Sequence, residues 1–457
     1  MKTIRIGAAQ GFYGDTIDAA VYTAKYGDVQ YICFDCLAEL TMAILAKDKN
    51  KDERLGYTKD LTVAMKSLLP YVKEKGIKLL TNAGGINPLA AKDEVVRVAR
   101  ELGITDLKVA VVTGDDVLPN LKNWQEQGVD LSHADTNKPF DATRDYLFAN
   151  AYLGVWPIVE ALKQGAEVII TGRTTDSAQF LAPAVYEFGW QVDDWNQLAH
   201  GILMGHLLEC SAQSTGGNFS GDWHSIGDMD TIGYPIAEIG ESGEFMITKA
   251  EGSGGLVSFD TVREQLLYEI HDPSSYITPD VIVDLSQVCL EEIGEHQVRV
   301  SNVFGKPAPR QLKVVMGYGD GYMSQTLIGY SWPKAYEKAQ RAAQIIEKQI
   351  RAKKVPIDEL HFDYVGYNSL HGPLASEPTD DINEIYLRIA VKAQSKEIVA
   401  TIPRFIPPLG LNGPPSLGGL MNLPPRQLLG MWATLIDRML IEPAITITYE
   451  TIVQEVV

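Results

Sequence analysis

Two carboxylates stand four residues apart directly after a short apolar segment. Asp35 and Glu39 follow residues 31–34, and this spacing puts two side chains on one face of a helix. Paired carboxylates suit proton transfer or the binding of one divalent cation. In the alternative interpretation they only stabilise the start of a helix through its dipole. We predict a catalytic pair, to which Asp15 is a candidate third member.

A cation beside two hydroxyls follows another apolar segment. The run Gly172-Arg173-Thr174-Thr175-Asp176 comes after Ala166–Ile170 and before a predicted helix that begins at Ser177. Backbone N–H groups at a helix start and a guanidinium form an anion site, whereas the alternative is a helix cap with a surface arginine. A chain of net charge −19 needs a local cation to hold an acid. We therefore predict that this segment binds a carboxylate or phosphate of the substrate, through Arg173, Thr174, Thr175 and Asp176.

Glycine and asparagine dominate the segment after a third apolar stretch. Glycines allow close backbone approach to a ligand, and asparagine amides offer donors; the alternative is a plain turn. The G-x-G-x-x-G spacing is missing, so the segment carries no nicotinamide or flavin signature. We predict substrate-binding roles here and in the first glycine-rich turn, for Asn82, Gly84, Gly85, Asn87, Gly11 and Asp15.

A histidine, a glutamate and a cysteine precede a glycine-rich loop. His206 stands four residues before Cys210, so the two side chains touch if the segment is helical, and the thiol is a candidate nucleophile. Glu209 is an alternative general base, and a packed structural thiol is the simplest interpretation. His271 is a further catalytic candidate or a helix cap. The loop that we predict to close over a ligand contains Gly216, Gly217 and Asn218.

Metal chemistry has little support in the residue spacing. Cys33 and Cys36 have the CxxC spacing, but Cys33 lies in an apolar strand and no second pair accompanies it. Buried structural thiols are the better interpretation. The histidines show no zinc spacing. Mg²⁺ on oxygen ligands is the one cofactor left open, and its ligands stay unknown.

Short apolar segments that alternate with helical periodicity must position these residues. We expect strands at 3–9, 31–34, 78–81, 107–112 and 166–170, with helices at 16–26, 93–102, 158–163 and from 177. This alternation predicts an α/β fold with a mostly parallel, Rossmann-like sheet and helices on both faces, followed by a smaller α+β region. Ligands sit at the carboxyl ends of parallel strands, and all five ends are rich in Gly, Asn, Asp and Thr.

The later part of the chain changes character. Beyond residue 279 we expect short strands, such as Leu312–Met316 and Tyr386–Ala393, a long helix at Lys334–Lys353 and a proline-rich stretch at Ile406–Pro425. We divide the chain into an N-terminal α/β domain (1–190), a glycine-rich-loop region that completes the core (191–345) and a C-terminal α+β extension (346–457).

Charge and composition narrow the function classes. The chain has 457 residues, a net charge of −19 and four cysteines. An acidic surface repels phosphate backbones, so nucleic acid and anionic membrane are not expected partners. No signal peptide or membrane-spanning run is visible, and we expect a cytoplasmic protein. The apolar, proline-rich tail from Phe405 to Leu440 indicates a homo-oligomer.

Several blocks in a fixed order resemble the acyclic terpene utilisation A (AtuA-like, formerly DUF1446) family from about residue 4 to residue 345. The blocks are residues 7–15, 34–41, 81–88, 172–176, 188–190, 205–210, 216–219, 233–238, 254–257, 265–273 and 276–280. The resemblance implies a catabolic role in the breakdown of branched acyclic terpenoid acids. It also implies a short form without the fused C-terminal ferredoxin-fold module, so that a separate small ferredoxin-fold subunit becomes an expected partner.

The residues and the resemblance together lead to one functional hypothesis and two alternatives. We predict a lyase or hydro-lyase that acts on a branched carboxylic acid or its acyl-CoA thioester. An enolate-type reaction needs a base beside a group that stabilises an oxyanion, and the predicted loops supply both. The first alternative is a non-catalytic binding or scaffold subunit that acts with a small partner. The second is a hydrolase that uses Cys210 or a serine, although the chain has no G-x-S-x-G motif.

Overall fold

The apolar segments predicted as strands form neighbouring parallel strands of one large sheet. The structure is a computed structural model and describes residues 2–379 and 382–453; the outermost residues of the predicted first and last domains, 1 and 454–457, lie outside the described residues. The parallel strands are β1 (Thr3–Ala8), β2 (Tyr31–Phe34), β3 (Lys78–Thr81), β6 (Val168–Thr171) and β4 (Leu107–Thr113), in that order. Their near-complete burial is typical of parallel strands with both faces covered. The predicted α/β class is confirmed.

Antiparallel strands extend this sheet at both ends. β7 pairs with β1, and β18 pairs with β4 over Thr446–Ile452. The added strands are β11 (Cys289–Gly294), β12 (Gln297–Ser301), β8 (Phe245–Lys249), β7 (Pro235–Gly240) and β18 (Thr446–Ile452). A small separate sheet contains β13 (Phe304–Lys306), β10 (Ile282–Asp284) and β9 (Tyr276–Ile277).

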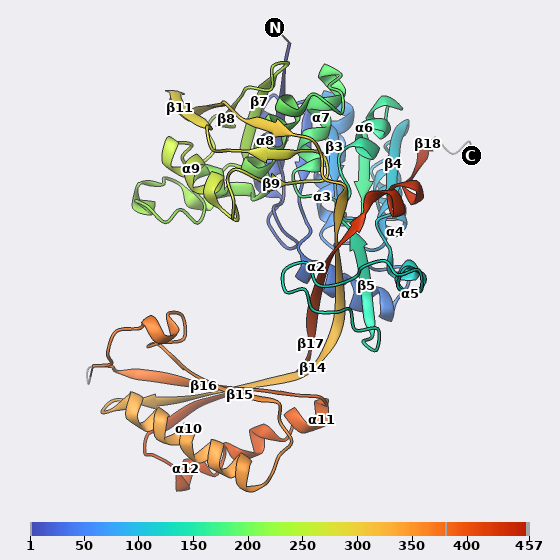
Figure 1. Ribbon diagram of the computed structural model, residues 1–457. Coiled ribbons are helices and arrows are strands. Elements are labelled where there is room, and N and C mark those ends of the chain that lie inside the picture. Colours follow the sequence, from blue (N-terminus) through green and yellow to red (C-terminus); the bar gives the residue numbers. More distant parts are fainter. Residues whose placement is uncertain (1, 380–381, 454–457) are drawn as a thin grey trace. The chain divides into compact units, whose positions relative to one another are not determined.

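Two groups of helices pack against the large sheet. Helices α1, α3 and α4 contact one another in sequence, and so do α6, α7 and α8 (Figure 1). Helix α4 begins at Pro88, earlier than predicted, because proline is tolerated in the first helical turn. The helices are α1 (Asp18–Tyr26), α2 (Glu39–Lys51), α3 (Leu61–Lys75), α4 (Pro88–Glu101), α5 (Leu121–Glu126), α6 (Trp156–Lys163), α7 (Ala178–Phe188), α8 (Trp195–Glu209) and α9 (Phe259–Leu267).

A second sheet has its own apolar core. Its strands are ordered β15-β16-β14-β17, and α10 lies along one face (Figure 1). Ala339, Ala343, Ile346 and Ile350 of α10 repeat at helical spacing and are buried against alternate residues of β16. The elements are β14 (Gln311–Ser331), β15 (Glu359–Val365), β16 (Glu384–Ala393), β17 (Leu417–Asp437), α10 (Ala335–Ala352), α11 (Lys396–Val399) and α12 (Leu409–Asn412); β5 (Tyr146–Ala151) also pairs with β14.

The chain forms two compact units. One contains residues 2–317 and 431–453, and the other contains residues 318–430. β14 and β17 each have residues in both units. The predicted domain boundaries at 190/191 and 345/346 stay a prediction, because one compact unit can hold more than one domain.

One expectation about the later strands is wrong, and one proline-rich segment has a structure that was not predicted. The short strand predicted at Leu312–Met316 is part of β14, which is 21 residues long. The prolines of the Ile406–Pro425 stretch do not exclude a strand, since Pro424 and Pro425 lie within β17. β17 is the last strand in its sheet order, and an edge strand tolerates residues that cannot donate a ladder hydrogen bond.

Candidate functional site

The segments that follow the parallel strands are linked by buried hydrogen bonds. The backbone N–H of Asp35 donates to the carbonyl oxygen of Gln10 at 3.0 Å. The Asn82 side chain donates from Nδ2 to Oδ1 of Asp35 at 2.6 Å and accepts from the backbone N–H of Cys36 at 2.7 Å. The ends of β1, β2 and β3 therefore form one polar layer, and Asn82 lies at its centre as a buried side chain.

Arg173 connects this layer to the ends of β4 and β6. Its backbone N–H donates to Oδ2 of Asp115 at 2.8 Å, and its Nη1 donates to the carbonyl oxygen of Leu37 at 3.0 Å and to Oδ1 of Asp176 at 2.7 Å. The guanidinium carbon lies 4.0 Å from the ring centroid of Tyr152. Arg173 is only 3% exposed, so its charge acts inside the cluster. Its predicted role as a substrate anchor stays a prediction.

Helix α8 brings a glutamate and a histidine to the same edge. A Cβ at Gly205 would lie 2.5 Å from Cβ of Ser177, and one at Gly11 would lie 2.7 Å from the carbonyl oxygen of Glu209. Contacts this short leave no room for a side chain. The absence of a Cβ at both positions therefore lets the C-terminal end of α8 approach α7 and the first turn closely.

His206 and Glu209 form a buried pair. Nε2 of His206 lies 2.9 Å from the carbonyl oxygen of Gln265, and its Nδ1 lies 3.0 Å from Oε1 of Glu209. A carbonyl only accepts, so Nε2 carries a hydrogen. Nδ1 then accepts from a protonated Glu209 or donates as part of an imidazolium. In both states the pair holds one proton between the two side chains.

Burial and neighbouring charges shift the pKa values of the clustered groups. Burial raises the pKa of Asp35 well above its usual value, and the nearby carboxylate of Asp176 adds to this, while Arg173 opposes it. Burial also raises the pKa of Glu209 despite its bond to His206. Burial lowers the pKa of His206, but Glu209 outweighs this effect and the net shift is upward. The cluster thus contains two neighbouring carboxyl groups of raised pKa, and one of them, Asp35, lies near the buried guanidinium of Arg173.

Two buried polar atoms of this cluster keep unused hydrogen-bonding capacity. Within the described part of the chain, no partner lies within hydrogen-bonding reach of Nε of Arg173 or Oε2 of Glu209. Buried polar atoms are normally satisfied, so this pair leaves one donor and one carboxyl oxygen for a bound molecule.

A cavity of about 450 Å³ opens beside the cluster. Thr175 and Asp176 line it from the end of β6, Tyr152 from the segment after β5, and Tyr276 and Lys313 from β9 and β14. Asp176 bonds Arg173 and is about one-third exposed, so it connects the cavity to the buried cluster.

Glu39 and Lys313 form an ion pair at this cavity. Nζ of Lys313 lies 3.1 Å from Oε1 of Glu39, and the Tyr152 hydroxyl donates to the same oxygen at 2.5 Å. Burial opposes ionisation of Glu39, but the bond from Tyr152 and the charge of Lys313 lower its pKa to about 2. Lys313 remains 46% exposed and is, with Arg310, an accessible cation of the cavity lining.

The predicted Asp35–Glu39 helix face is wrong. The residues after β2 are extended up to Ala38 (φ −113°, ψ 169°), and α2 begins only at Glu39. Asp35 therefore joins the buried cluster, whereas Glu39 pairs with Lys313. The two carboxylates have different partners and opposite pKa shifts.

The predicted contact between His206 and Cys210 is also wrong. Helix α8 ends at Glu209, so Cys210 lies outside the helical repeat and His206 bonds Glu209 instead. Burial raises the pKa of Cys210, which disfavours the reactive thiolate. A nucleophilic role for Cys210 stays a prediction.

The glycine-rich segment after β3 packs on the protein itself. A Cβ at Gly84 would lie 2.4 Å from the carbonyl oxygen of Thr171, and one at Gly85 would lie 2.3 Å from Leu45. Nδ2 of Asn87 donates to the carbonyl oxygens of Glu53 and Leu55. Close packing thus accounts for these residues, and of this predicted set Asn82 is the one in the cluster.

The other predicted residues have local structural contacts. The Asp15 side chain accepts from the backbone N–H groups of Gly11 and Thr16. Nε2 of Gln179 donates to the buried Thr174 hydroxyl. Asn218 donates to Gln213, and both Gly216 and Gly217 lie close to other atoms of their own loop region. His271 is exposed beyond the end of α9 at Leu267.

Sequence reasoning did not find three residues of the site. Tyr152, Tyr276 and Lys313 line the cavity. Lys313 had one signal, because it is a charged residue within an otherwise apolar strand segment. Tyr276 had another, because it lies in residues 276–280, one of the blocks that carry the family resemblance. Tyr152 had no signal, because its position depends on pairing across the fold: its backbone N–H donates to the carbonyl oxygen of Lys313.

The described residues contain neither a cluster of metal-binding side chains nor a helix suited to a membrane span. Residues 2–379 and 382–453 contain no group of three or more His, Cys, Asp or Glu side chains arranged to hold a metal ion. Over the same ranges, none of the helices combines the length and apolarity that crossing a bilayer requires.

Comparison with known proteins gives one match. The model of the family described as acyclic terpene utilisation family protein AtuA matches residues 4–447. No curated protein matches the chain significantly.

Proposed function

Because this chain belongs to the acyclic terpene utilisation family AtuA, we propose that it is a lyase that adds or removes water on a branched carboxylic acid or its CoA thioester. One observation carries this proposal. The buried carboxyl groups of Asp35 and Glu209, both of raised pKa, are electrostatic neighbours, and Asp35 also neighbours the buried Arg173, whose partner Asp176 lines a cavity of suitable size.

Dehydration needs two groups in opposite protonation states. A base takes the proton from the carbon next to the carbonyl group, and an acid protonates the hydroxyl that leaves as water. A carboxyl group of raised pKa retains a proton and serves as the acid, while the other carboxyl group, once ionised, serves as the base. Glu209 shares a proton with His206, so it has a local source that restores its state. Hydration is the same sequence in reverse.

The anionic end of the substrate requires a cation that solvent and ligand can reach. Lys313, although paired with Glu39, meets this requirement because its side chain is 46% exposed, whereas Arg173 is buried. In this proposal Lys313 attracts the carboxylate or thioester phosphate, and Tyr152 beneath it supplies an apolar ring surface. The enolate-like charge that develops is stabilised by the field of Arg173.

Exchange of substrate hydrogen with solvent tests the proposal. The purified chain is incubated in D2O with branched 3-hydroxyacyl-CoA and 2-enoyl-CoA thioesters and with the free acids. Mass spectrometry then measures deuterium at the carbon next to the carbonyl and the formation of the hydrated or dehydrated product. Asp35→Asn and Glu209→Gln are expected to lower both rates by about 100-fold or more.

Asp280→Asn is the matched control. Asp280 is also a buried carboxyl group of raised pKa, but it accepts from the backbone N–H of Val155 at the start of α6. Full exchange in Asp35→Asn and Glu209→Gln would refute acid–base catalysis by this pair. No exchange by the wild-type chain with any of these substrates would favour a non-catalytic binding subunit.

A further inference from the structure

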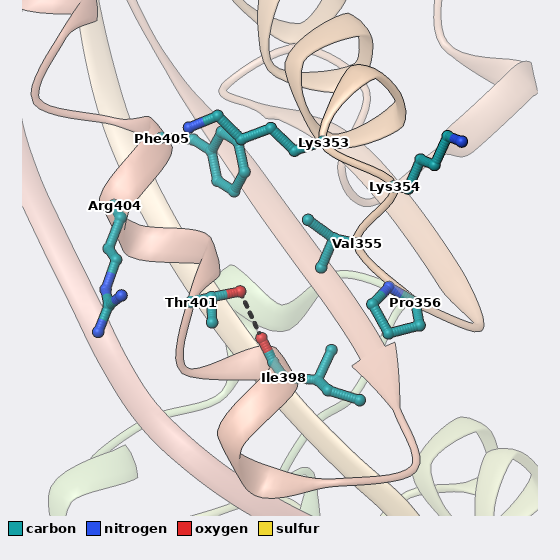
Figure 2. Close-up of a pocket in the computed structure, with 8 residues that line it drawn as sticks. All are labelled: Lys353, Lys354, Val355, Pro356, Ile398, Thr401, Arg404 and Phe405. Carbon is teal, nitrogen blue, oxygen red and sulfur yellow. Dashed lines mark hydrogen bonds between the residues drawn. The ribbon is translucent and has the colours of Figure 1, made fainter.

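A separate pocket lies within the second unit, at the C-terminal end of α10. Its volume is about 350 Å³, at the small end of the range for ligand pockets (roughly 300–1,000 Å³). It is lined by Lys353, Lys354, Val355, Pro356, Ile398, Thr401, Arg404 and Phe405 (Figure 2).

The interior of this pocket is apolar. Figure 2 shows Val355, Ile398 and Thr401 toward its centre, with the Phe405 ring at one end. The Thr401 hydroxyl donates to the carbonyl oxygen of Ile398 at 2.7 Å, so its proton is already used. The interior therefore favours binding of an apolar group, because the side chains at the centre offer no free donor to a polar group that loses its hydration there.

The rim of the pocket is cationic. Lys353, Lys354 and Arg404 are exposed, and none of them forms an ion pair with another residue of the ranges 2–379 and 382–453. Nζ of Lys353 lies 5.0 Å from the Phe405 ring centroid, while Lys354 and Arg404 project on opposite sides of the pocket (Figure 2). A ligand bound in the interior thus places its end within reach of positive charge from several directions.

The second unit does not share the acidity of the whole chain. Residues 318–430 contain twelve Lys and Arg against eleven Asp and Glu, although the full chain has a net charge of −19. The charge that repels anions therefore belongs to the other unit. At the pocket, Lys353 and Lys354 follow one another directly after the end of α10 and, with Arg404, give the rim three positive charges.

We propose that this pocket binds an amphipathic organic anion, with its apolar body in the interior and its carboxylate, sulfonate or phosphate head at Lys353, Lys354 and Arg404. Neither the volume nor the cations of this pocket depend on the chemistry at Asp35 and Glu209. The proposal is therefore independent of the lyase function.

Methyl NMR on the full chain tests this site separately from the other cavity. Val355 and Ile398 carry methyl groups inside the pocket, whereas Ile277 carries methyl groups at the cavity beside Tyr276. Octanoate is titrated into chain labelled at Ile and Val methyls. We expect saturable shifts of the Val355 and Ile398 signals, weaker at high salt because the rim charges are exposed to solvent.

Matched ligands and variants show whether the rim charges, and not only the apolar interior, contribute to octanoate binding. 1-Octanol has the apolar body without the charge, and inorganic phosphate has charge without the body; both are expected to bind at least several-fold more weakly. The double substitution Lys353→Met and Arg404→Met is expected to weaken octanoate binding by about tenfold, since each exposed ion pair contributes modestly. Lys348→Met, on the same helix but outside the pocket lining, is expected to leave it unchanged.

Three results would overturn the proposal. The first is an absence of Val355 and Ile398 shifts at any octanoate concentration. The second is equal binding of octanol and octanoate, and the third is equal weakening by Lys348→Met and by the double substitution. Shifts confined to Ile277 also count against this pocket, although they agree with the proposed lyase site.

Discussion

Removal of the Asp115 carboxyl charge is expected to stabilise the chain at neutral pH and to leave it unchanged in mild acid. Oδ2 of Asp115 accepts from the backbone N–H of Arg173 and from Nδ2 of Asn150, each at 2.8 Å. Burial nevertheless raises the pKa of this group from 3.8 to about 6. The folded state thus disfavours the ionised form, although both hydrogen bonds oppose the shift.

The magnitude follows from proton linkage. Between pH 3.8 and about 6 the unfolded chain ionises Asp115 while the folded chain keeps it protonated, so stability falls as the pH rises through this window. A pKa shift of one unit corresponds to about 1.4 kcal/mol. The shift of the Asp115 pKa from 3.8 to about 6 therefore lowers the free energy of unfolding by on the order of 3 kcal/mol at pH values above 6. In Asp115→Asn the amide oxygen still accepts both bonds and no charge is buried.

Urea unfolding of wild-type and Asp115→Asn chains at about pH 4 and about pH 7.5 measures the effect. All tryptophans except Trp332 lie outside residues 318–430, so tryptophan fluorescence mainly follows the unit that contains Asp115. The variant is expected to gain on the order of 3 kcal/mol over wild type between the two pH values. Asp116→Asn removes an exposed carboxylate from the next position and controls for the loss of one negative charge. Equal gains in both variants, or a gain for Asp115→Asn that shrinks as the pH rises, would refute the reasoning.

Three further expectations concern packing, ion pairing and thiol reactivity. Gly205→Ala should lower the free energy of unfolding, measured by calorimetry, by about 1–3 kcal/mol because the new Cβ would contact Ser177. The control is Gly227→Ala, whose Cβ would meet nothing within 4 Å and which should change the free energy of unfolding by less than about 0.5 kcal/mol. Equal effects of the two substitutions would contradict the packing argument. Glu39→Gln should lower the free energy of unfolding by about 1 kcal/mol at neutral pH, after allowance for partial exposure. This loss should disappear as the pH falls from about 4.5 towards 2, because a lowered pKa stabilises the fold only where the group is ionised. A loss that persists in denaturation curves near pH 2 would exclude the ion pair as its source. Iodoacetamide followed by peptide mass spectrometry should modify the exposed Cys289 before Cys210, Cys33 and Cys36, because burial raises the pKa of those three thiols; faster modification of Cys210 would indicate an activated thiol.

The strands that position the site were predictable because each is a short apolar run that ends in polar residues. The bounds expected for β2 and β3 agree with the structure, and the parallel order brings Asp35, Asn82 and Arg173 to one edge. The bounds of each strand could be predicted because the apolar pattern within a single segment determines them.

The partners of these residues were not predictable, because they depend on where helices end and on contacts across long stretches of chain. Glu209 rather than Cys210 bonds His206 only because α8 stops at Glu209. Arg173 became buried because the carbonyl oxygen of Leu37 and the Tyr152 ring lie against it. No spacing within the sequence encodes those distances, and the same holds for the partnership of Glu39 with Lys313, which are 274 residues apart.

The position of β18 has a consequence for synthesis on the ribosome. β18 covers β4 at one edge of the large sheet, but it follows residues 318–430, which form the other compact unit. While that insertion is being translated, the edge of β4 that does not pair with β6 presents an unpaired row of backbone N–H and C=O groups over Leu107–Thr113. Nascent chains of this protein thus pass through a stage in which an apolar strand edge is open to pairing with other chains, and chaperone capture at this stage would protect the fold until Thr446–Ile452 emerges.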